Sequence, residues 1–560
     1  MITLRKIALF SLSILLVACQ SAPKHAVVTH QQAVASAHPM ATVAGLEILN
    51  AGGNAFDAAV AVSATLAVVE PYSSGIGGGG FWLLHRASDN TTVMVDGREV
   101  APLKASRDMY LKKNGEVDPK ASIDGPRAAG IPGEPAALDY IARHYGKLSL
   151  AASLTPAIRA ARAGFRVTPH YRQMATFRRD VLRRSPAAAA SFLQDNEVPQ
   201  LGYTITQPEL AATLQAMADK GRDGFYRGEV ADKLIQGVQQ AGGIWTHKDL
   251  HDYQIRLRTP QVIHYRGNTI TTAALPSSGG IVMAEMFNML SQWDWQGMST
   301  LQRRHYEIEV MRRAYRDRAL YLGDPDKVNV PVTRLTSMAY AQKLSADIQP
   351  DKATPSSELP GISEQPGGNH TTHFSIIDKD GNRVSATLSV NYPFGSCFVP
   401  PGTGVLLNDE MDDFSAKPGT PNAYGLVGAE ANAIAPGKRM LSSMSPTFVE
   451  NKDRLAIIGT PGGSRIITMV FEGILAFIDG KNAHAIVAQA RFHHQYLPDV
   501  VQFEPGAFSA ELQEDLQFMG YNLRELDGPY GNMQLVILDK RTQAVTAASD
   551  PRVEGAAQVE

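Results

Sequence analysis

The sequence predicts a mixed α/β protein, because helical and strand patterns alternate along much of its 560 residues. Ala-rich helical patterns cover residues 40–50 and 55–69, and Gly52 and Gly53 end the first of them. Further helical patterns cover residues 207–218, 228–240 and 306–322. The chain is 44% hydrophobic, which is enough for a large core, although its length alone suggests three or four domains of about 150 residues.

The second helical pattern is followed by a glycine-rich stretch, residues 75–80, with the spacing of a dinucleotide-binding loop. A dinucleotide site requires a strand, then the loop, then a helix. Here a helical pattern precedes the glycines and a strand pattern, residues 81–84, follows them. The order of elements therefore argues against a nucleotide site.

A β-hairpin pattern begins directly after a linker that spans residues 351–369. The linker holds three Pro and three Gly among polar residues, which predicts an exposed and flexible segment. Residues 378–382 carry a turn signal, and residues 383–391 alternate apolar side chains with Arg, Ser, Thr and Asn. If the hairpin closes around residues 379–381, Thr371 lies opposite Ser389, give or take one residue, with Asn391 beside it.

The junction between His370 and Thr371, where the linker meets the hairpin, is predicted to be a cleavage site that exposes a nucleophile. A threonine at a new chain terminus can use its own α-amine as the general base, because that amine has a pKa near 8 and lies within reach of the hydroxyl. No separate histidine is then required.

A glycine pair, Gly462 and Gly463, follows an apolar strand pattern at residues 455–458 and precedes a buried helical pattern at residues 466–478. Glycines at such a helix start let backbone N–H groups approach an anion closely, as acyl transfer requires. A plain tight turn is the alternative interpretation.

Histidine pairs and an arginine-rich helix are interpreted as structural. His247 and His251 are four residues apart, but Lys248 stands where a zinc protease carries its Glu, and His493 and His494 have no carboxylate nearby in sequence. No metal is therefore assigned. Six arginines lie within the helical pattern at residues 306–322 or just before it. They are expected on the solvated face of this helix: Arg303, Arg304, Arg312, Arg313, Arg316 and Arg318.

The formal charge is −2, from 53 basic and 55 acidic residues, so the chain has no electrostatic footprint for nucleic acid.

Residues 1–18 read as a signal peptide whose end, Leu16-Val17-Ala18-Cys19, resembles a bacterial lipoprotein signal. Its apolar run is too short to span a bilayer. We expect acylation of Cys19, a tether over residues 19–38, and a periplasmic protein held at the outer membrane of a Gram-negative cell, since Gln20 follows the cysteine. An ordinary cleaved signal and a free periplasmic protein is the competing hypothesis.

Only two cysteines occur, Cys19 and Cys397, and Cys19 lies in the export signal, so a structural disulfide within the mature chain is improbable.

Several motifs in the same order along the chain resemble γ-glutamyltransferases, which are N-terminal-nucleophile hydrolases. The resemblance covers His38 to the C-terminus and is carried by residues 371–375 with 378–382, 404–414, 441–446, 459–465 and, upstream, 96–102. It implies a four-layer αββα sandwich built as one body from two fragments, a large subunit of residues 39–370 and a small catalytic subunit of residues 371–560. It implies no cofactor.

The resemblance also implies roles for individual residues. Thr371 is the nucleophile after self-cleavage at His370, and Ser389, where family members often have Thr, hydrogen-bonds it. Gly462 and Gly463 form the oxyanion hole. The remaining positions bind the glutamyl group: Arg98, Ser442 and Ser443 its α-carboxylate, Asn391, Glu410 and Asp413 its ammonium, and Tyr424, in a lid loop at residues 417–439, closes the pocket. Taken alone, Arg98 could be a surface salt bridge, Asp412 and Asp413 a helix cap, and Tyr424 a packing anchor.

The implied function is transfer and hydrolysis of the γ-glutamyl group of glutathione and related compounds, with amino acids, dipeptides or water as acceptors. One alternative is an acylase that removes glutaryl or related side chains from β-lactams, which needs the carboxylate clamp but no ammonium site. A second alternative is a lipid-anchored protein that binds γ-glutamyl peptides without catalysis. A chain that never cleaves itself would support this binding protein.

Overall fold

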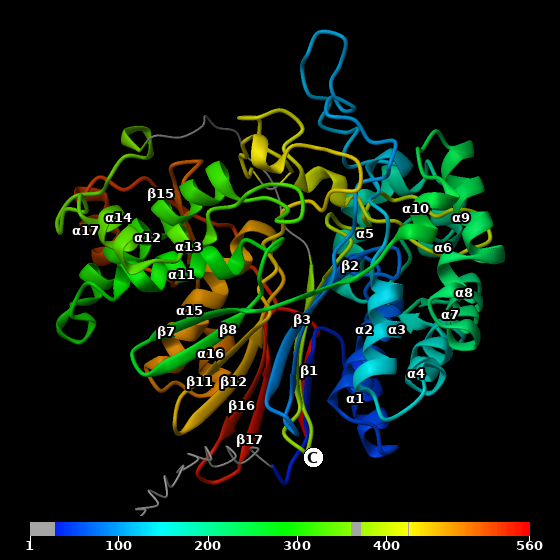
Figure 1. Ribbon diagram of the computed structural model, residues 1–560, viewed down its shortest axis with the longest axis horizontal. Coiled ribbons are helices and arrows are strands. Elements are labelled where there is room, and N and C mark those ends of the chain that lie inside the picture. The colour runs from blue at the N-terminus through cyan, green and yellow to red at the C-terminus, as the bar shows by residue number, and fades with distance from the viewer. Residues whose placement is uncertain (1–28, 360–370, 424) are drawn as a thin grey trace, which may run out of the picture.

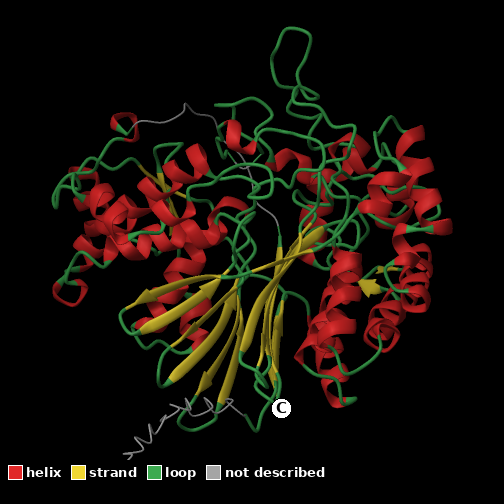
Figure 2. Cartoon of the chain, in the orientation of Figure 1, coloured by secondary structure: helices red, strands yellow, loops and turns green. Residues whose placement is uncertain are grey.

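The computed structural model describes residues 29–359, 371–423 and 425–560. Two β-sheets face each other, and helices cover the outer face of each sheet (Figures 1 and 2). The arrangement is a four-layer αββα sandwich, as predicted. No helix in the described ranges is long and apolar enough to cross a membrane.

The first sheet has seven strands in the described part of the chain, and every neighbouring pair is antiparallel. In spatial order these are β18 (Ala556–Val559), β1 (Ala33–Ser36), β9 (Thr372–Ile377), β10 (Arg383–Ser389), β2 (Gly79–Arg86), β3 (Thr91–Gly97) and β6 (Arg256–Arg258). Strand β9 therefore lies inside the sheet, with hydrogen-bonded partners on both edges.

The second sheet has six antiparallel strands within the same described ranges. Their order is β17 (Val545–Ser549), β16 (Gln534–Asp539), β12 (Arg454–Gly459), β11 (Thr447–Glu450), β8 (Asn268–Thr272) and β7 (Gln261–Tyr265). Smaller sheets join β4 (Phe165–Arg166) with β5 (Thr204–Ile205), and β13 (Phe492–His493), β14 (Val501–Phe503) and β15 (Leu523–Glu525).

Both large sheets mix strands from before and after the predicted cleavage site. The first takes β1, β2, β3 and β6 from the upstream part and β9, β10 and β18 from the downstream part. The second takes β7 and β8 from upstream and its other four strands from downstream. Neither part can complete a sheet alone, so the chain folds as one interleaved body. The predicted tether to residue 38 is too long, because β1 is a buried strand between β9 and β18.

Helices of the upstream part cover the first sheet and form the right side of Figure 1. They are α1 (Pro39–Asn50), α2 (Ala55–Val69), α3 (Glu134–Tyr145), α4 (Leu150–Ala163), α5 (Pro169–Leu182), α6 (Pro186–Phe192), α7 (Pro208–Lys220), α8 (Asp223–Tyr226), α9 (Gly228–Gln240) and α10 (His247–Asp252). The patterns predicted α2 and α9 to the residue, and α2 begins with a capping box between Asn54 and Asp57.

The second sheet is covered by the helices on the left of Figure 1. These are α11 (Gly279–Leu290), α12 (Thr300–Tyr321), α13 (Val332–Leu335), α14 (Met338–Ser345), α15 (Ile466–Ile478), α16 (Ala483–Ala488) and α17 (Ala510–Phe518). Helix α12 begins six residues before the predicted start, because Ser299 and Gln302 form a capping box there.

The predicted solvated arginine face of α12 is wrong. Arg312, Arg313 and Arg318 are buried, with relative exposures of 2%, 1% and 5%. Each donates to a buried acceptor from another part of the chain, Ser356 Oγ, the Leu344 carbonyl and Ser443 Oγ respectively, which compensates the cost of removing the charge from water. Sequence periodicity could not show this, because those acceptors lie tens to hundreds of residues away.

The linker prediction also needs correction over residues 351–359. Ala353, Ser356 and Leu359 are buried there, and Ser356 starts a short 3₁₀ turn, η3 (Ser356–Glu358). Residues 360–370 lie outside the described part. The linker is therefore partly buried up to residue 359, although Asp351, Lys352, Ser357 and Glu358 are exposed as predicted.

The hairpin of β9 and β10 is buried on both faces. Its apolar face, with Phe374 and Leu388, packs in the core under α2. Its hydroxyl face turns toward the second sheet, where Ser375 donates to the Gln534 carbonyl (3.1 Å) and Ser385 to the Ile458 carbonyl (3.2 Å). Polar side chains thus bond the two sheets together and fix the position of β9.

The glycine-rich stretch before β2 allows close packing behind β10. A Cβ atom at Gly77 would lie 2.0 Å from the Leu406 carbonyl oxygen, and one at Gly78 would lie 2.2 Å from that of Ser389. No larger residue fits at either position. A strand follows the glycines, as predicted, so this is a packing site.

Candidate active site

Thr371 lies directly before β9, buried at 6% exposure, and it lines two cavities. The last paired residues of the hairpin are Thr372 and Leu388, so one further step places Thr371 level with Ser389. This confirms the predicted register. The Ser389 hydroxyl accepts a hydrogen bond from the backbone N–H of Asn391 (2.7 Å), which holds these two residues in one turn beside Thr371.

The smaller cavity, about 20 Å³, brings together most of the residues that the sequence indicated. Leu426, Met444, Ser464 and Ile466 complete its wall. Its other lining residues were all predicted: Arg98, Thr371, Ser389, Asn391, Glu410, Asp413, Ser442, Ser443 and Gly463. These nine positions come from six separate stretches of sequence and from both sides of the predicted cleavage site.

Arg98 is the charged centre of this cavity. Its Nη1 donates to Glu410 Oε2 (2.6 Å), its Nη2 donates to Asp413 Oδ2, and its Nε reaches the Met440 carbonyl (3.3 Å). Burial opposes the charge of Arg98, but Glu410 and Asp413 outweigh this effect and raise the pKa of the guanidinium. The predicted carboxylate binder, Arg98, therefore pairs with two of the predicted ammonium binders, Glu410 and Asp413.

Glu99 is a functional-site residue that the role assignments missed. Its carboxylate lies 3.7 Å from Arg98 Nη1, is fully buried, and has no hydrogen-bond partner among the described residues. Burial and the neighbouring charge of Glu410 raise the pKa of Glu99 well above its ordinary value. Burial likewise raises the pKa of Glu410, because Arg98 offsets it only in part. Three carboxyl groups thus lie within 4 Å of one arginine.

The two serines are held by contacts from α11 and α12. Ser443 Oγ accepts from Arg318 Nη2 (3.1 Å), and the same guanidinium donates through Nε to Ser278 Oγ (3.0 Å). Ser442 Oγ accepts from the backbone N–H of Met444 (3.1 Å). Arg318, expected on a solvated face, instead orients Ser443 toward the cavity.

Asn408, also missed, ties three parts of the site together. Its Oδ1 accepts from the backbone N–H groups of Gly130 (2.9 Å) and Glu410 (3.0 Å), and its Nδ2 donates to the Gly77 carbonyl (2.7 Å). The side chain is fully buried, so its bonds fix the 3₁₀ turn η4 (Glu410–Asp413). Asp412 lies inside this turn and accepts from Ser122 Oγ (2.8 Å), so it is no helix cap.

The glycine pair lies beside Thr371, between the end of β12 and the start of α15, as the pattern predicted. Gly462 lines the larger cavity and Gly463 the smaller one. Both have positive φ angles, 146° and 56°, so the turn depends on glycine. A Cβ on Gly462 would also lie 2.4 Å from the Met469 side chain.

The larger cavity, about 590 Å³, is also lined by Thr371. Its wall includes Gly462, His170, Glu70, Tyr530 and Glu554. Glu70 is buried and accepts a hydrogen bond from Thr372 Oγ1 (2.6 Å), next to the predicted nucleophile. Burial, with a smaller contribution from Glu554, raises the pKa of Glu70 to about 8. No motif pointed to Glu70, which ends the helical pattern of α2.

Other predicted positions are placed as follows. Tyr424, His370 and Cys19 lie outside the described residues. The described part of the loop at residues 417–439 contains one 3₁₀ turn, η5 (Glu430–Asn432), and its Ala423 N–H donates to Asp412 (2.9 Å) while Leu426 reaches the smaller cavity. The loop prediction is confirmed for these residues.

The histidine pairs lie away from both cavities. His247 and His251 are exposed on α10, whereas His493 and His494 are buried, and His494 contacts Asp499 (3.2 Å), a carboxylate that the sequence reading overlooked. In the described ranges, no group of three or more His, Cys, Asp or Glu residues could hold a metal ion. Cys397 is buried against Arg178 Nε (3.2 Å).

The arrangement supplies the parts of an acyl-transfer site. Thr371, at the end of a fixed strand, lines one cavity together with Gly463 and the buried charges, and a second, larger cavity together with Gly462. A buried guanidinium and buried carboxyl groups together complement a zwitterionic head group.

Comparison with known proteins gives consistent matches over most of the chain. A model of the gamma-glutamyltranspeptidase family matches residues 41–560. Glutathione hydrolase proenzymes from Pseudomonas aeruginosa and Escherichia coli are 43% and 41% identical, cover 93% and 94% of this chain, and are themselves covered to 93% and 91%.

Two solved structures are also similar. A cephalosporin acylase from Bacillus halodurans is 29% identical with a TM-score of 0.83 and covers 97% of this chain and 99% of its own. The gamma-glutamyltranspeptidase of Helicobacter pylori is 39% identical with a TM-score of 0.57 over 58% of this chain and 94% of its own.

Glu70 predicts how stability depends on pH. Its pKa is about 8 in the folded protein and 4.5 ordinarily, so between these values the folded state keeps a proton that the unfolded state releases. Stability should therefore fall as pH rises through this window. Glu70→Gln keeps the hydrogen-bond acceptor for Thr372 but cannot be deprotonated. Its drop in Tm from pH 5 to pH 8 should therefore be smaller than that of the wild type by about 2 °C or more.

Thermal unfolding of both proteins across this range checks the expectation. Glu229→Gln, at a fully exposed position on α9, is the matched control and should follow the wild type. Parallel pH curves for the wild type and Glu70→Gln would contradict the role assigned to Glu70.

Proposed function

Because this chain belongs to the gamma-glutamyltranspeptidase family, we propose that it cleaves itself at His370–Thr371 and then hydrolyses or transfers the γ-glutamyl group of glutathione and related compounds. The observation that carries this proposal is the cavity that joins Thr371 to Arg98, Glu410 and Asp413. A guanidinium and carboxylates at one end of a pocket match the carboxylate and ammonium of a glutamyl group, and the nucleophile faces its other end.

Maturation begins with the Thr371 hydroxyl. Its Oγ attacks the carbonyl carbon of His370, the peptide C–N bond breaks as an ester forms, and the nitrogen becomes the free α-amine of Thr371. Water then hydrolyses the ester and releases the carboxylate of His370. The two fragments stay together, because both large sheets contain strands from each.

Turnover uses the same hydroxyl. The freed α-amine accepts its proton, Oγ attacks the γ-carbonyl carbon of the donor, and the backbone N–H groups of Gly462 and Gly463 stabilise the oxyanion, at roughly 3 to 4 kcal/mol per donor in other enzymes. The γ-amide bond breaks, and the amine leaves with a proton. Water, an amino acid or a dipeptide then attacks the γ-glutamyl ester of Thr371 and regenerates the hydroxyl. Ser389 holds the nucleophile in position.

Binding of the glutamyl group requires a change of partners in the smaller cavity. Arg98 gives up part of its pairing with Glu410 and Asp413 to bind the α-carboxylate, with Ser442 and Ser443 as further donors. The released carboxylates, with Asn391, then accept hydrogen bonds from the ammonium. The exchange keeps each buried charge paired, which limits the cost of desolvation. Tyr424 and the lid loop keep water from the acyl-enzyme.

Acylase activity is the second candidate, favoured by the fold similarity to the cephalosporin acylase. Such a substrate has a carboxylate but no ammonium at this end, and it would leave the Glu410 and Asp413 carboxylates without a cationic partner. The higher identity to glutathione hydrolases also supports γ-glutamyl chemistry. Parallel assays with γ-glutamyl and glutaryl anilides separate the two, because they differ only in the α-ammonium.

Thr371→Ala should remain a single chain. The wild type should yield a downstream fragment of 560 − 370 = 190 residues that begins at Thr371, and an upstream fragment of 370 − 18 = 352 residues. Mass spectrometry of the purified proteins and an assay with a γ-glutamyl anilide, with and without a dipeptide acceptor, measure both steps. A fully active wild type that stays uncleaved would remove the self-cleavage step and the α-amine as base.

Arg98→Lys keeps the positive charge but loses the planar fork that bonds two oxygens at once. We expect KM for γ-glutamyl substrates to rise about tenfold or more, from the loss of a charge-assisted hydrogen bond, while self-cleavage proceeds normally. Arg86→Lys, at an exposed pair with Asp89, is the matched control. Unchanged kinetics in Arg98→Lys would exclude Arg98 from the substrate site.

For location, we propose a lipoprotein acylated at Cys19 and held at the outer membrane on its periplasmic side. The support is the lipobox-like sequence before Cys19 and the polar residues that follow it. Cell fractionation should find the wild type with membranes and Cys19→Ala in the soluble periplasm. Equal amounts of both proteins in the soluble fraction would reject the anchor and leave the catalytic proposal intact.

A further inference from the structure

A tyrosine on α12 holds the turn that carries the glycine pair. Tyr315 is 1% exposed, and its hydroxyl donates to the carbonyl of Ser464 (2.5 Å). Ser464 belongs to the 3₁₀ turn η6 (Gly463–Arg465) and lines the smaller cavity together with Thr371 and Gly463. Burial raises the pKa of Tyr315, so the hydroxyl keeps the proton that it donates. The contact therefore joins a buried helix directly to the wall of the cavity.

Two peptide groups continue this contact as a chain of hydrogen bonds. The Ser464 carbonyl and the Arg465 N–H are opposite ends of one planar, trans peptide group. The Arg465 N–H donates to the Gly462 carbonyl (3.1 Å). The Gly462 carbonyl and the Gly463 N–H are in turn opposite ends of a second peptide group. The chain thus runs from Tyr315 through two rigid units and ends at the Gly463 N–H.

Such a chain acts on its last N–H in two ways. The N–H of a trans peptide points away from its own carbonyl, so a bond that fixes the Gly462 carbonyl also fixes the direction of the Gly463 N–H. Hydrogen bonds in series also polarise one another, which strengthens the final donor. The peptide between Gly462 and Gly463 depends on this support, because neither residue has a Cβ that restricts its rotation.

The same face of α12 also contacts the glutamyl end of the cavity. The ring of Tyr315 packs edge-on against His493, with 5.6 Å between the ring centroids. Arg318 follows Tyr315 by three residues, so both lie on one face of the helix. Arg318 donates to Ser443 Oγ (3.1 Å), and Ser443 lines the smaller cavity. One helix face therefore holds both the glycine turn and a serine that is predicted to bind the α-carboxylate.

We propose that Tyr315 is a positioning residue for acyl transfer, which orients the Gly463 N–H toward the oxyanion through these two peptide groups. The inference rests on the proposed function, in which this N–H stabilises the oxyanion. Formation and hydrolysis of the γ-glutamyl ester both pass through an oxyanion, so Tyr315 contributes to whichever step limits kcat. Binding of the glutamyl head group to Arg98 does not use this N–H and is independent of Tyr315.

Tyr315→Phe tests the proposal, because it removes one hydroxyl and keeps the ring against His493. We expect kcat for hydrolysis of a γ-glutamyl anilide, per cleaved molecule, to fall about tenfold, less than the roughly hundredfold or greater loss when an oxyanion donor itself is removed in other enzymes. Competitive inhibition by L-glutamate, which occupies the head-group pocket without forming an oxyanion, should match that of the wild type. Unchanged kcat, or an equal loss of glutamate binding and kcat, would overturn the proposal.

Thr468→Val is the matched control on the same turn. Thr468 Oγ1 contacts the Arg465 carbonyl (3.0 Å), and the N–H at the other end of that peptide, on Ile466, donates to the Gly463 carbonyl. This second chain therefore ends at the Ser464 N–H, which is not one of the two proposed oxyanion donors.

The comparison of these two variants separates orientation of one N–H from general rigidity of the turn. Thr468 Oγ1 also contacts His493 Nδ1 (2.8 Å), so Thr468→Val removes at least as many polar contacts as Tyr315→Phe does. We expect wild-type kcat in Thr468→Val. An equal fall of kcat in both variants would mean that the turn needs only rigidity, and it would overturn the proposal.

Tyr171→Phe controls for the loss of a buried tyrosine hydroxyl. Tyr171 is also 1% exposed, donates to the Phe192 carbonyl (2.7 Å), and is not among the described residues that line either cavity. Tm should fall by similar small amounts in Tyr171→Phe and Tyr315→Phe, whereas kcat should fall only in Tyr315→Phe. A wild type that is inactive on the anilide would reject the proposed function itself. An active wild type with an equally active Tyr315→Phe would reject only the role of Tyr315.

Discussion

The packing of β9 is the constraint on which the rest of this structure depends. The strand is hydrogen-bonded to β1 and β10 on its two edges, lies under α2 on one face, and is bonded to the second sheet through hydroxyl groups on the other. A strand restrained on four sides has one position, so the residue at its N-terminal end has one as well. Thr371 thereby obtains a fixed location without any contribution from a flexible loop, as its proposed role of nucleophile requires.

Near Thr371 the fold buries charged side chains, none of which would be stable there without an oppositely charged partner. Arg98 pairs with Glu410 and Asp413 at the smaller cavity, and burial raises the pKa of the neighbouring Glu99 well above its ordinary value. These side chains suit a ligand that carries a positive and a negative charge. Each ion pair that is lost within the protein is then replaced by an ion pair with the ligand, so the charge balance hardly changes. Two buried residues outside the cavity lining hold lining residues in place by hydrogen bonds: Arg318 binds Ser443, and Asn408 binds the backbone of Glu410.

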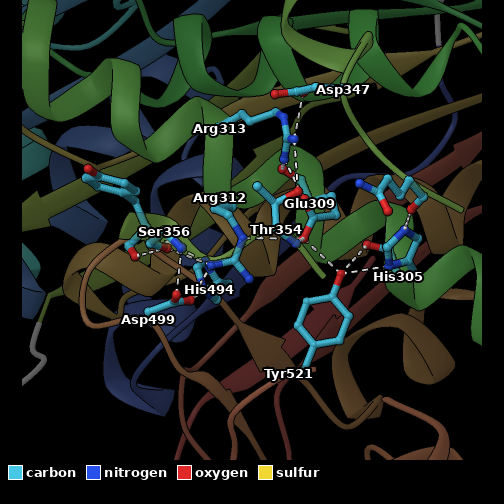
Figure 3. Close-up of polar contacts among 12 residues, drawn as sticks. His305, Glu309, Arg312, Arg313, Asp347, Thr354, Ser356, His494, Asp499 and Tyr521 are labelled. Atoms are coloured by element: carbon cyan, nitrogen blue, oxygen red, sulfur yellow. Dashed lines mark hydrogen bonds and ion pairs between the residues drawn. The ribbon is translucent and has the colours of Figure 1, made fainter. Parts of the chain in front are cut away.

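The interleaved sheets would limit the structural effect of the proposed cut at His370–Thr371. Each large sheet contains strands from before and after this position, so the two proposed fragments share one core. In the proposed function, cleavage changes the chemistry at Thr371, by creating an amine, more than it changes the fold. A buried ion network on α12 also binds residues from both sides of this position, since Arg312 donates to Ser356 and pairs with Asp499 (Figure 3).

The sequence by itself determined the elements and the register near Thr371. Residues 55–69, 228–240 and 466–478 are helices as predicted, and the hairpin pairs as its turn required. These features depend on residues two to four positions apart, or on a short turn, so a local pattern contains them. The motifs also named nine residues that line one cavity, although their contacts could be inferred only through the family resemblance.

Only the tertiary structure decided which polar side chains are buried and what they bind. Arg312 and Arg318 read as surface residues, the linker read as exposed, and β1 read as part of a tether, because each finds its partner in a distant part of the chain. Glu70 and Glu99 gave no signal, since their raised pKa values come from the packed surroundings and not from their neighbours in sequence. Burial is a property of the whole fold, and a local pattern cannot report it.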